Sequence, residues 1–193
     1  MLDGHYEIDF DDFEQKIRDN NVKLFLLCSP HNPVGRVWKK WELEKIGEIC
    51  IRYGVIVVSD EIHSDFTWGE NKHLMFASLS DDFANISITC TAPSKTFNLA
   101  GLQVSNIFIP NETLRLKFKK AVDAAGYSQV NVMGLEACQA AYEYGEDWLT
   151  QLKAYLTENI AFVRNFIADR LPQLSLIEPE GTYLLWLIFV HLV

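Results

Sequence analysis

The sequence has little basic charge and no paired cysteines. Of its 193 residues, 17 are Lys or Arg and 26 are Asp or Glu, so the formal net charge is −9. A general nucleic-acid binder needs a basic surface that neutralises phosphates, so this charge argues against one. No two cysteines form a C-x-x-C pair, and each lies in an apolar stretch. We therefore expect buried free thiols in a reducing cytosol, and a cytoplasmic protein, rather than disulfides or metal ligands. The four are Cys28, Cys50, Cys90 and Cys138.

The sequence also lacks a long apolar run. The apolar run at residues 183–193 has 11 residues, whereas a membrane helix needs about 20. We expect no membrane contact and a buried strand there, and its unfinished end suggests a fragment. The first residues are too acidic for a signal peptide. Hydrophobic residues make up 49% and charged residues 22%, a composition that argues against disorder and favours a globular domain.

Apolar runs that alternate with amphipathic stretches predict an α/β fold. The run at residues 38–53 has helical spacing and stops at Gly54, and it joins two strands, which makes a βαβ unit with parallel strands. Strands are expected at residues 23–28, 55–60, 86–91 and 104–109.

The second half of the sequence is more helical. Helices are expected at residues 112–125, 130–144 and 148–171, and a strand at 174–177. The third helix keeps one apolar stripe for some six turns, long enough to bridge two domains. We therefore divide the chain into residues 1–148, a linking helix at 149–172, and the first part of a small α+β domain at 173–193.

Three expected strands are followed by polar residues suited to chemistry. These segments are residues 29–35, 59–65 and 92–101. Ligands of open α/β sheets bind beyond the carboxyl ends of the strands, so an amide, a carboxylate and an amine should meet at one edge. The sequence has no metal-ligand spacing, P-loop, G-x-G-x-x-G or G-x-S-x-G motif, so we expect no metal site.

These segments carry a family resemblance. PHNPVGR at residues 30–36, SDEIHSDF at 59–66 and APSKTFNLAGLQ at 92–103 resemble the fold-type I pyridoxal 5′-phosphate enzymes, the class I/II aminotransferase superfamily. Within it, they look like the cystathionine β-lyase (cysteine-S-conjugate β-lyase) branch. The resemblance implies a three-layer large domain with a mostly parallel sheet, incomplete here, and pyridoxal phosphate as the cofactor.

The resemblance also implies roles for single residues. Lys95 matches the lysine that binds the cofactor covalently and later removes the Cα proton of the substrate. Asp60 matches the carboxylate that keeps the pyridine nitrogen protonated. Asn32 matches the amide that bonds the ring hydroxyl, and the Asn32–Pro33 peptide is expected to be cis. His63 stands where many aminotransferases have a tyrosine on the same hydroxyl, although a plain polar residue at a helix start is equally open.

The phosphate contacts follow the family less well. Ser94 and Thr96 each carry a hydroxyl that suits the phosphate, and we favour Ser94. The family often has an arginine eight residues after the lysine, and Gln103 occupies that position. The charge of the phosphate must then be met by other groups.

The implied reaction is release of a thiol, pyruvate and ammonia from a sulfur-containing amino acid. An aminotransferase is the alternative within the family, and an inactive fragment or association module is the alternative of another class. Family members usually form their sites at a homodimer interface. They also have a preceding segment and an arginine for the substrate carboxylate, and neither is found in this sequence.

Other polar or aromatic residues suit a structural role better. His5, His73 and His191 are isolated and are expected at the surface or in loops. Trp68 either borders the site or packs within a loop. Glu61 should point to the opposite side of the chain from Asp60.

Overall fold

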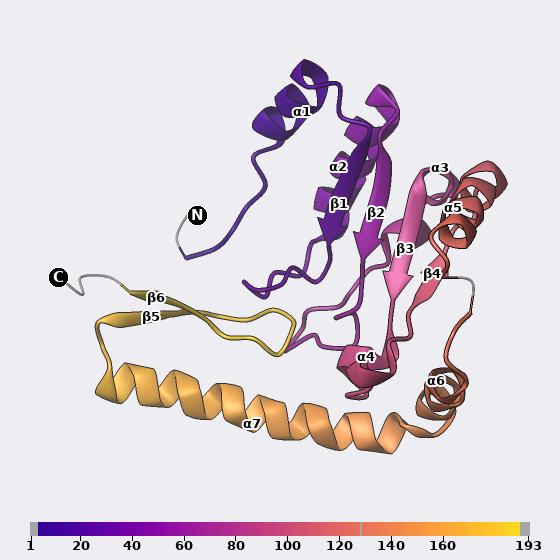
Figure 1. Ribbon diagram of the computed structural model, residues 1–193. Helices are drawn as coiled ribbons and strands as arrows, with labels where there is room; N and C mark the ends of the chain where they lie inside the picture. Colours follow the sequence, from indigo (N-terminus) through magenta and orange to yellow (C-terminus); the bar gives the residue numbers. More distant parts are fainter. Residues whose placement is uncertain (1–3, 128, 190–193) are drawn as a thin grey trace.

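A four-stranded sheet forms the centre of the computed structural model, which describes residues 4–127 and 129–189 (Figure 1). The strand order is β1-β2-β3-β4. The first three strands are parallel and β4 is antiparallel to β3. The α/β class and the mostly parallel sheet expected from the sequence are therefore confirmed. The strands are β1 (Leu24–Cys28), β2 (Ile56–Asp60), β3 (Ser87–Thr91) and β4 (Asn106–Phe108).

Three helices cover one face of the sheet: α1 (Phe10–Asp19), α2 (Lys40–Tyr53) and α3 (Asp81–Asn85). Asp9 and Ser80 cap the first and third of these by accepting hydrogen bonds from backbone N–H groups of the first turn. Helix α2 ends at Gly54, whose φ of 67° is the left-handed conformation that glycine tolerates. The core between these helices and the sheet includes Phe10, Ile17, Leu27, Leu43, Ile46, Ile49, Val57, Phe76 and Phe83.

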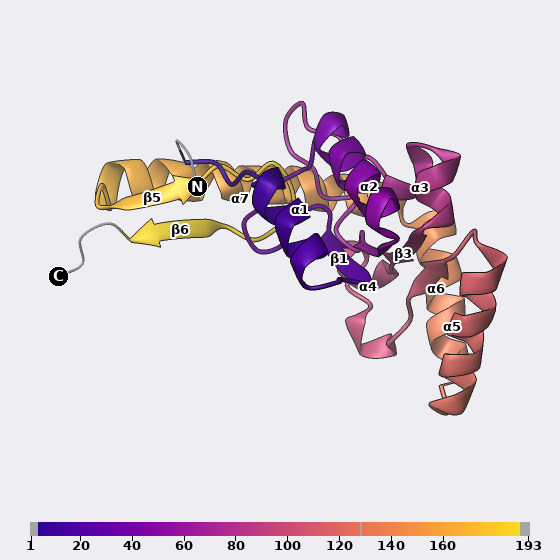
Figure 2. The same cartoon turned by 90° about the horizontal axis from the view of Figure 1, so that it is seen from above.

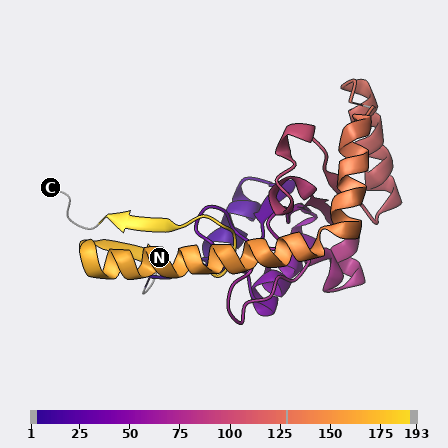
Figure 3. The same ribbon diagram turned by 90° about the horizontal axis from the view of Figure 1, so that it is seen from below.

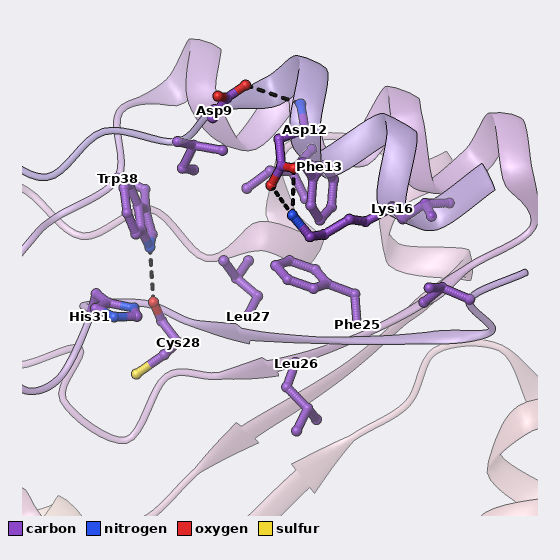
Figure 4. A pocket seen from close by; sticks show the side chains of 14 residues that line it. Asp9, Asp12, Phe13, Lys16, Phe25, Leu26, Leu27, Cys28, His31 and Trp38 are labelled. Atoms are coloured by element: carbon purple, nitrogen blue, oxygen red, sulfur yellow. Dashed lines mark hydrogen bonds and ion pairs between the residues drawn. The ribbon is translucent and has the colours of Figure 1, made fainter. Parts of the chain in front are cut away.

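The other face of β1 is poorly covered within the described part of the chain. Phe25 and Leu27 point towards α1, whereas Leu26 points away from it (Figure 4). Leu26 is 69% exposed, although it lies in the middle of a strand. Side chains two residues apart share a face of a strand, so Cys28 lies on the same open face as Leu26.

The chain after β3 contains α4 (Pro93–Thr96), α5 (Glu112–Ala124), α6 (Val132–Tyr144) and α7 (Glu146–Arg170). Helix α7 runs past the carboxyl ends of the strands, with α4 between it and the sheet, and continues well beyond the sheet (Figures 1 and 3). Its far part lies along the antiparallel hairpin of β5 (Leu174–Ile177) and β6 (Trp186–Phe189). Two short 3-10 turns, η1 (Phe76–Ser78) and η2 (Ala100–Leu102), complete the elements.

The expected burial of the C-terminal run is wrong. A strand does form at β6, but Phe189 at its end is 60% exposed and Trp186 is 37% exposed. The hairpin has two strands and projects away from the sheet (Figure 2), so the main core does not cover it. Residues 190–193 of the run, including His191, lie outside the described residues. The division of the chain at residues 148 and 172 stays a prediction.

Among the described residues, no helix combines the length and the apolar character that crossing a bilayer requires.

Candidate functional site

Asp60 lies at the centre of the carboxyl edge of the sheet. Its Cα is in register with Cys28 of β1 and with Cys90 of β3, so the three side chains share one face. Burial raises the pKa of both thiols, and the charge of Asp60 raises each of them further. The thiols therefore stay neutral beside Asp60. This flanking pair could not be predicted from the sequence, because strand register cannot be derived from separate motifs.

His63 lies just beyond Asp60 and is 2% exposed. Neither ring nitrogen has a hydrogen-bond partner among the described residues. Burial lowers the pKa of His63, the Lys95 ammonium lowers it further, and Asp60 opposes the shift. His63 thus lies within electrostatic reach of both Lys95 and Asp60, which come from different strand ends. A neutral buried imidazole with two free nitrogens needs a polar partner, since an unsatisfied buried group costs about 1–3 kcal/mol.

Tyr183, from the segment between β5 and β6, completes the surroundings of His63. Its ring packs edge-on against His63 at 5.2 Å and against Phe66 at 5.1 Å between ring centroids. Tyr183 could not be predicted as a neighbour of His63, because it is far along the chain and belongs to none of the three motifs.

Lys95 lies in α4, whose first residue is Pro93. Lys95 and its neighbour Ser94 are half-buried, whereas Thr96 is 1% exposed. The Thr96 hydroxyl donates a hydrogen bond to Asp65 Oδ2 at 2.6 Å. Because this hydroxyl is already engaged inside the protein, Ser94 remains the better candidate for an anionic group.

Asn32 and Gln103 are exposed. Asn32 follows β1, and its backbone N–H donates to Cys28 Sγ at 3.3 Å. The Asn32–Pro33 peptide is cis, as expected, and the Ser29–Pro30 peptide is cis as well. Gln103 adopts a φ of 54° at the end of η2.

A loop between β5 and β6, residues 178–182, binds two of the motif segments. The backbone N–H groups of Glu180 and Gly181 both donate to Gly35 O at 2.9 Å, and Thr182 N–H donates to Phe66 O at 2.9 Å. A Cβ at Gly35 would lie 2.9 Å from Gly181 O, and its φ is 77°, so this close approach requires glycine.

Arg36 strengthens the junction between the loop at residues 178–182 and the motif segments. It is 7% exposed and pairs with Glu180 at 2.6 Å and with Glu42 of α2 at 2.7 Å. Its Nε also donates to Tyr6 O at 2.8 Å. One buried network therefore joins the loop at residues 178–182, the motif at residues 30–36 and α2.

His73 lies in the loop before η1, as expected, but its side chain is nearly buried and is not isolated. Its side chain is 8% exposed, and its Nε2 lies 2.7 Å from Glu61 Oε2. Glu61 is fully buried away from Asp60, as expected, and accepts hydrogen bonds from Ser59 Oγ at 2.8 Å and Phe76 N–H at 3.1 Å. A buried carboxylate needs such partners, which explains why His73 is drawn inside.

The remaining structural expectations have mixed outcomes. The four cysteines are free, as expected, but only Cys50 is buried, and the other three are half-buried. Cys28 and Cys90 lie on the open face of the sheet, so their apolar flanks did not imply full burial. Trp68 packs between its own loop and the loop at residues 178–182, where its Nε1 donates to Thr182 O at 2.6 Å. His5 is exposed, as expected.

A separate apolar cavity of about 450 Å³ lies between α1 and β1 (Figure 4). Its lining includes Phe13, Phe25 and Trp38, and Trp38 Nε1 donates to Cys28 O at 2.8 Å. Asp60, His63 and Lys95 do not line it. Within residues 4–127 and 129–189, no group of three or more His, Cys, Asp or Glu side chains is placed to hold a metal ion.

Known proteins with similar sequences identify the family. Residues 3–192 match the family described as aminotransferase class I and II. The chain belongs to this family. It is 49% identical over 187 residues to cystathionine beta-lyase PatB of Bacillus subtilis, an alignment that covers 97% of this chain and 48% of that protein.

Solved structures agree with this assignment. The fold matches cystalysin from Treponema denticola, which contains a pyridoxal 5′-phosphate cofactor, with a TM-score of 0.94 and 42% identity over 97% of this chain and 48% of that one. It also matches the PLP-bound C-S lyase from Staphylococcus hominis with a TM-score of 0.89 and 40% identity, over 95% of this chain and 46% of that one. The chain spans about half the length of these relatives.

Proposed function

We propose that this chain is part of a pyridoxal-phosphate-dependent C–S β-lyase that acts on a cysteine S-conjugate such as cystathionine. The observation that carries the proposal is the convergence of Asp60, His63 and Lys95 at one sheet edge, with both ring nitrogens of His63 buried and unpartnered within the described chain. Its relatives include a cystathionine β-lyase and a PLP-bound C-S lyase.

The residues at the sheet edge fit the cofactor chemically. Asp60 would hold a proton on the pyridine nitrogen, and the neutral thiols beside it would not compete for that role. When bound, pyridoxal phosphate supplies an electron sink for the electron pair left at Cα. Asn32 and the neutral His63 would bond the ring hydroxyl, since a neutral imidazole both donates and accepts. Ser94 would bond the phosphate.

Lys95 would hold the cofactor covalently and then act as the base. After the substrate amine displaces it, Lys95 Nζ is free to take the proton from Cα. The C–S bond would then break, and its electron pair would leave Cβ with the thiolate. Water would convert the remaining three-carbon unit to pyruvate and ammonia.

The setting of the enzyme is part of the proposal. We infer a cytoplasmic location because all four cysteines are free, and a sulfur-containing amino acid as the partner molecule. We also infer a homodimer of the whole protein, on the resemblance of the three motifs to a family of dimers.

The first experiment tests cofactor binding. The chain is mixed with pyridoxal phosphate, reduced with borohydride, and mapped by peptide mass spectrometry. We expect visible absorption of the lysine-bound cofactor before reduction, and label at Lys95 after it. Lys95→Ala should abolish both, whereas Lys120→Ala, an exposed lysine on α5, should change neither. Absence of both signals from the unaltered chain would favour an inactive fragment or association module.

The second experiment separates the lyase from its rival. Cystathionine is supplied to the loaded protein, and pyruvate and free thiol are measured. An aminotransferase is the second candidate, because the family that matches is described by that activity. Amino-group exchange with a keto acid, without thiol release, would decide for it.

A further inference from the structure

The turn that carries Lys95 is very short. Helix α4 has four residues, and Phe97 N–H to Pro93 O, at 2.9 Å, closes its one turn. A single helical turn has little stability of its own, because nucleating a helix fixes several residues for one hydrogen bond. The position of Lys95 must therefore be set by contacts from other parts of the chain.

Asp65 provides such contacts on one side. Its Oδ2 accepts the 2.6 Å hydrogen bond from Thr96, the residue directly after Lys95. Its backbone oxygen accepts a hydrogen bond from Lys153 Nζ of α7 at 2.7 Å. Asp65 thus joins α4 to the segment that carries Asp60 and His63, and this segment to the long helix.

Phe97 holds the other side of the turn. Its ring lies 5.5 Å from Tyr142 of α6 and 6.0 Å from Trp148 of α7, measured between centroids. The same ring occupies the space next to Gly145, where an added Cβ would lie 2.5 Å from it. Aromatic packing of this kind limits translation of the turn, whereas the directional bond from Thr96 limits its rotation.

We propose that Asp65 is a positioning residue for Lys95, acting through the hydroxyl of Thr96. This inference rests on the proposed role of Lys95 as the group that binds the cofactor and moves the Cα proton. Proton transfer requires the amine at a defined place, and a displacement of about 1 Å costs on the order of 100-fold in rate. A negative charge at Asp65 suits this role, since hydrogen bonds to a carboxylate are about twice as strong as neutral ones.

The test uses two substitutions at Thr96. Thr96→Val keeps the shape and removes the donor, whereas Thr96→Ser keeps the donor. The matched control is Thr157→Val on α7, which removes an exposed hydroxyl that donates to Lys153 O at 2.8 Å. Two readouts are measured on the full chain: amide hydrogen exchange at Phe97 without cofactor, and the rate at which pyridoxal phosphate with borohydride labels Lys95.

We expect Thr96→Val to speed exchange at Phe97 and to slow labelling of Lys95, each by about tenfold, with exchange in α2 unchanged. Thr96→Ser and Thr157→Val should stay within about twofold of the unaltered chain. Unchanged exchange at Phe97 in Thr96→Val, or faster exchange in α2 and α4 alike, would overturn the proposal. If the unaltered chain is not labelled at Lys95, the proposed function fails, and the exchange result still decides whether Asp65 positions this turn.

Discussion

His63 is a single residue whose titration should be visible in the stability of the protein. Burial, and then Lys95, lower its pKa in the folded state, so the unfolded chain binds the proton more readily. Stability that is present above the unfolded pKa, about 6.5, is therefore lost as the pH falls towards the lower folded pKa. We predict that His63→Asn weakens this loss. Urea unfolding without cofactor at pH 7 and pH 5 should show a smaller drop in unfolding free energy for the variant.

His5→Asn is the control for this measurement, since His5 is exposed. It should follow the unaltered chain at both pH values. An equal drop in the unaltered chain and in His63→Asn would mean that His63 does not titrate against the folded state.

Cys50 should be the least reactive thiol of the chain. It is fully buried, and burial raises its pKa to about 12. Because the thiolate is the reactive form, we predict that iodoacetamide at pH 8 modifies Cys28 and Cys90 of the native protein long before Cys50. Peptide mass spectrometry after timed quenching measures this order, and all four cysteines should react alike in urea. Early modification of Cys50 in the native state would show that α2 opens readily.

The same raised pKa means that ionisation of Cys50 destabilises the folded protein at alkaline pH. The folded pKa of Cys50 lies above the unfolded value. Its contribution to the unfolding free energy is therefore complete below the unfolded pKa and is lost as the pH rises towards 12.

At the scale of one element, α2 shows that helix propensity and packing can oppose each other. Gly47 lies on its buried face, and a Cβ there would lie 2.5 Å from the ring of Phe83. That ring stacks on Phe76 at 5.2 Å between centroids, so it has little room to move. Alanine gains about 1 kcal/mol over glycine from propensity, whereas overpacking a core costs about 1–3 kcal/mol.

We therefore predict that Gly47→Ala lowers the unfolding free energy by about 1 kcal/mol, although alanine has a higher helix propensity than glycine. Glu48→Ala, on the exposed face of the same helix, is the control and should change stability by less than about 0.5 kcal/mol. Urea titration measures both. A stabilised Gly47→Ala protein would show that Phe83 can yield and that propensity dominates.

For the whole molecule, the sequence predicted the strands and the longer helices after β1 because their signals are local, but it did not predict α1 or α3. Apolar runs placed β1 to β3 within a residue, and Gly54 marked the end of α2. Three strand ends were predicted to meet at one edge, since parallel strands require it. The sequence could not show what covers each face or which distant side chains meet. The exposure of Phe189, the burial of the His73 side chain, the contact of Tyr183 with His63, and the bond from Thr96 to Asp65 all depend on such long-range packing.

The junction between the C-terminal hairpin and the motif segments gives the last prediction. Glu180 accepts hydrogen bonds from Arg36 at 2.6 Å and from Val37 N–H at 2.8 Å, while Arg36 is buried. Removing one partner of a buried ion pair leaves a charge without full compensation, so Glu180→Ala should lower the unfolding free energy by about 3 kcal/mol. Glu178→Ala is the control. Glu178 is 54% exposed and pairs with Arg164 at the surface, so its loss should cost no more than about 0.5 kcal/mol.

The two variants should also differ in which backbone amides exchange hydrogen faster. If the hairpin loop holds the sheet edge together, Glu180→Ala should raise hydrogen exchange at Thr182 and at Gly35, which lie on opposite sides of the junction. Glu178→Ala should raise neither. Equal urea midpoints for the two variants would mean that the close contact of Gly35 with Gly181 holds the junction without the buried ion pair.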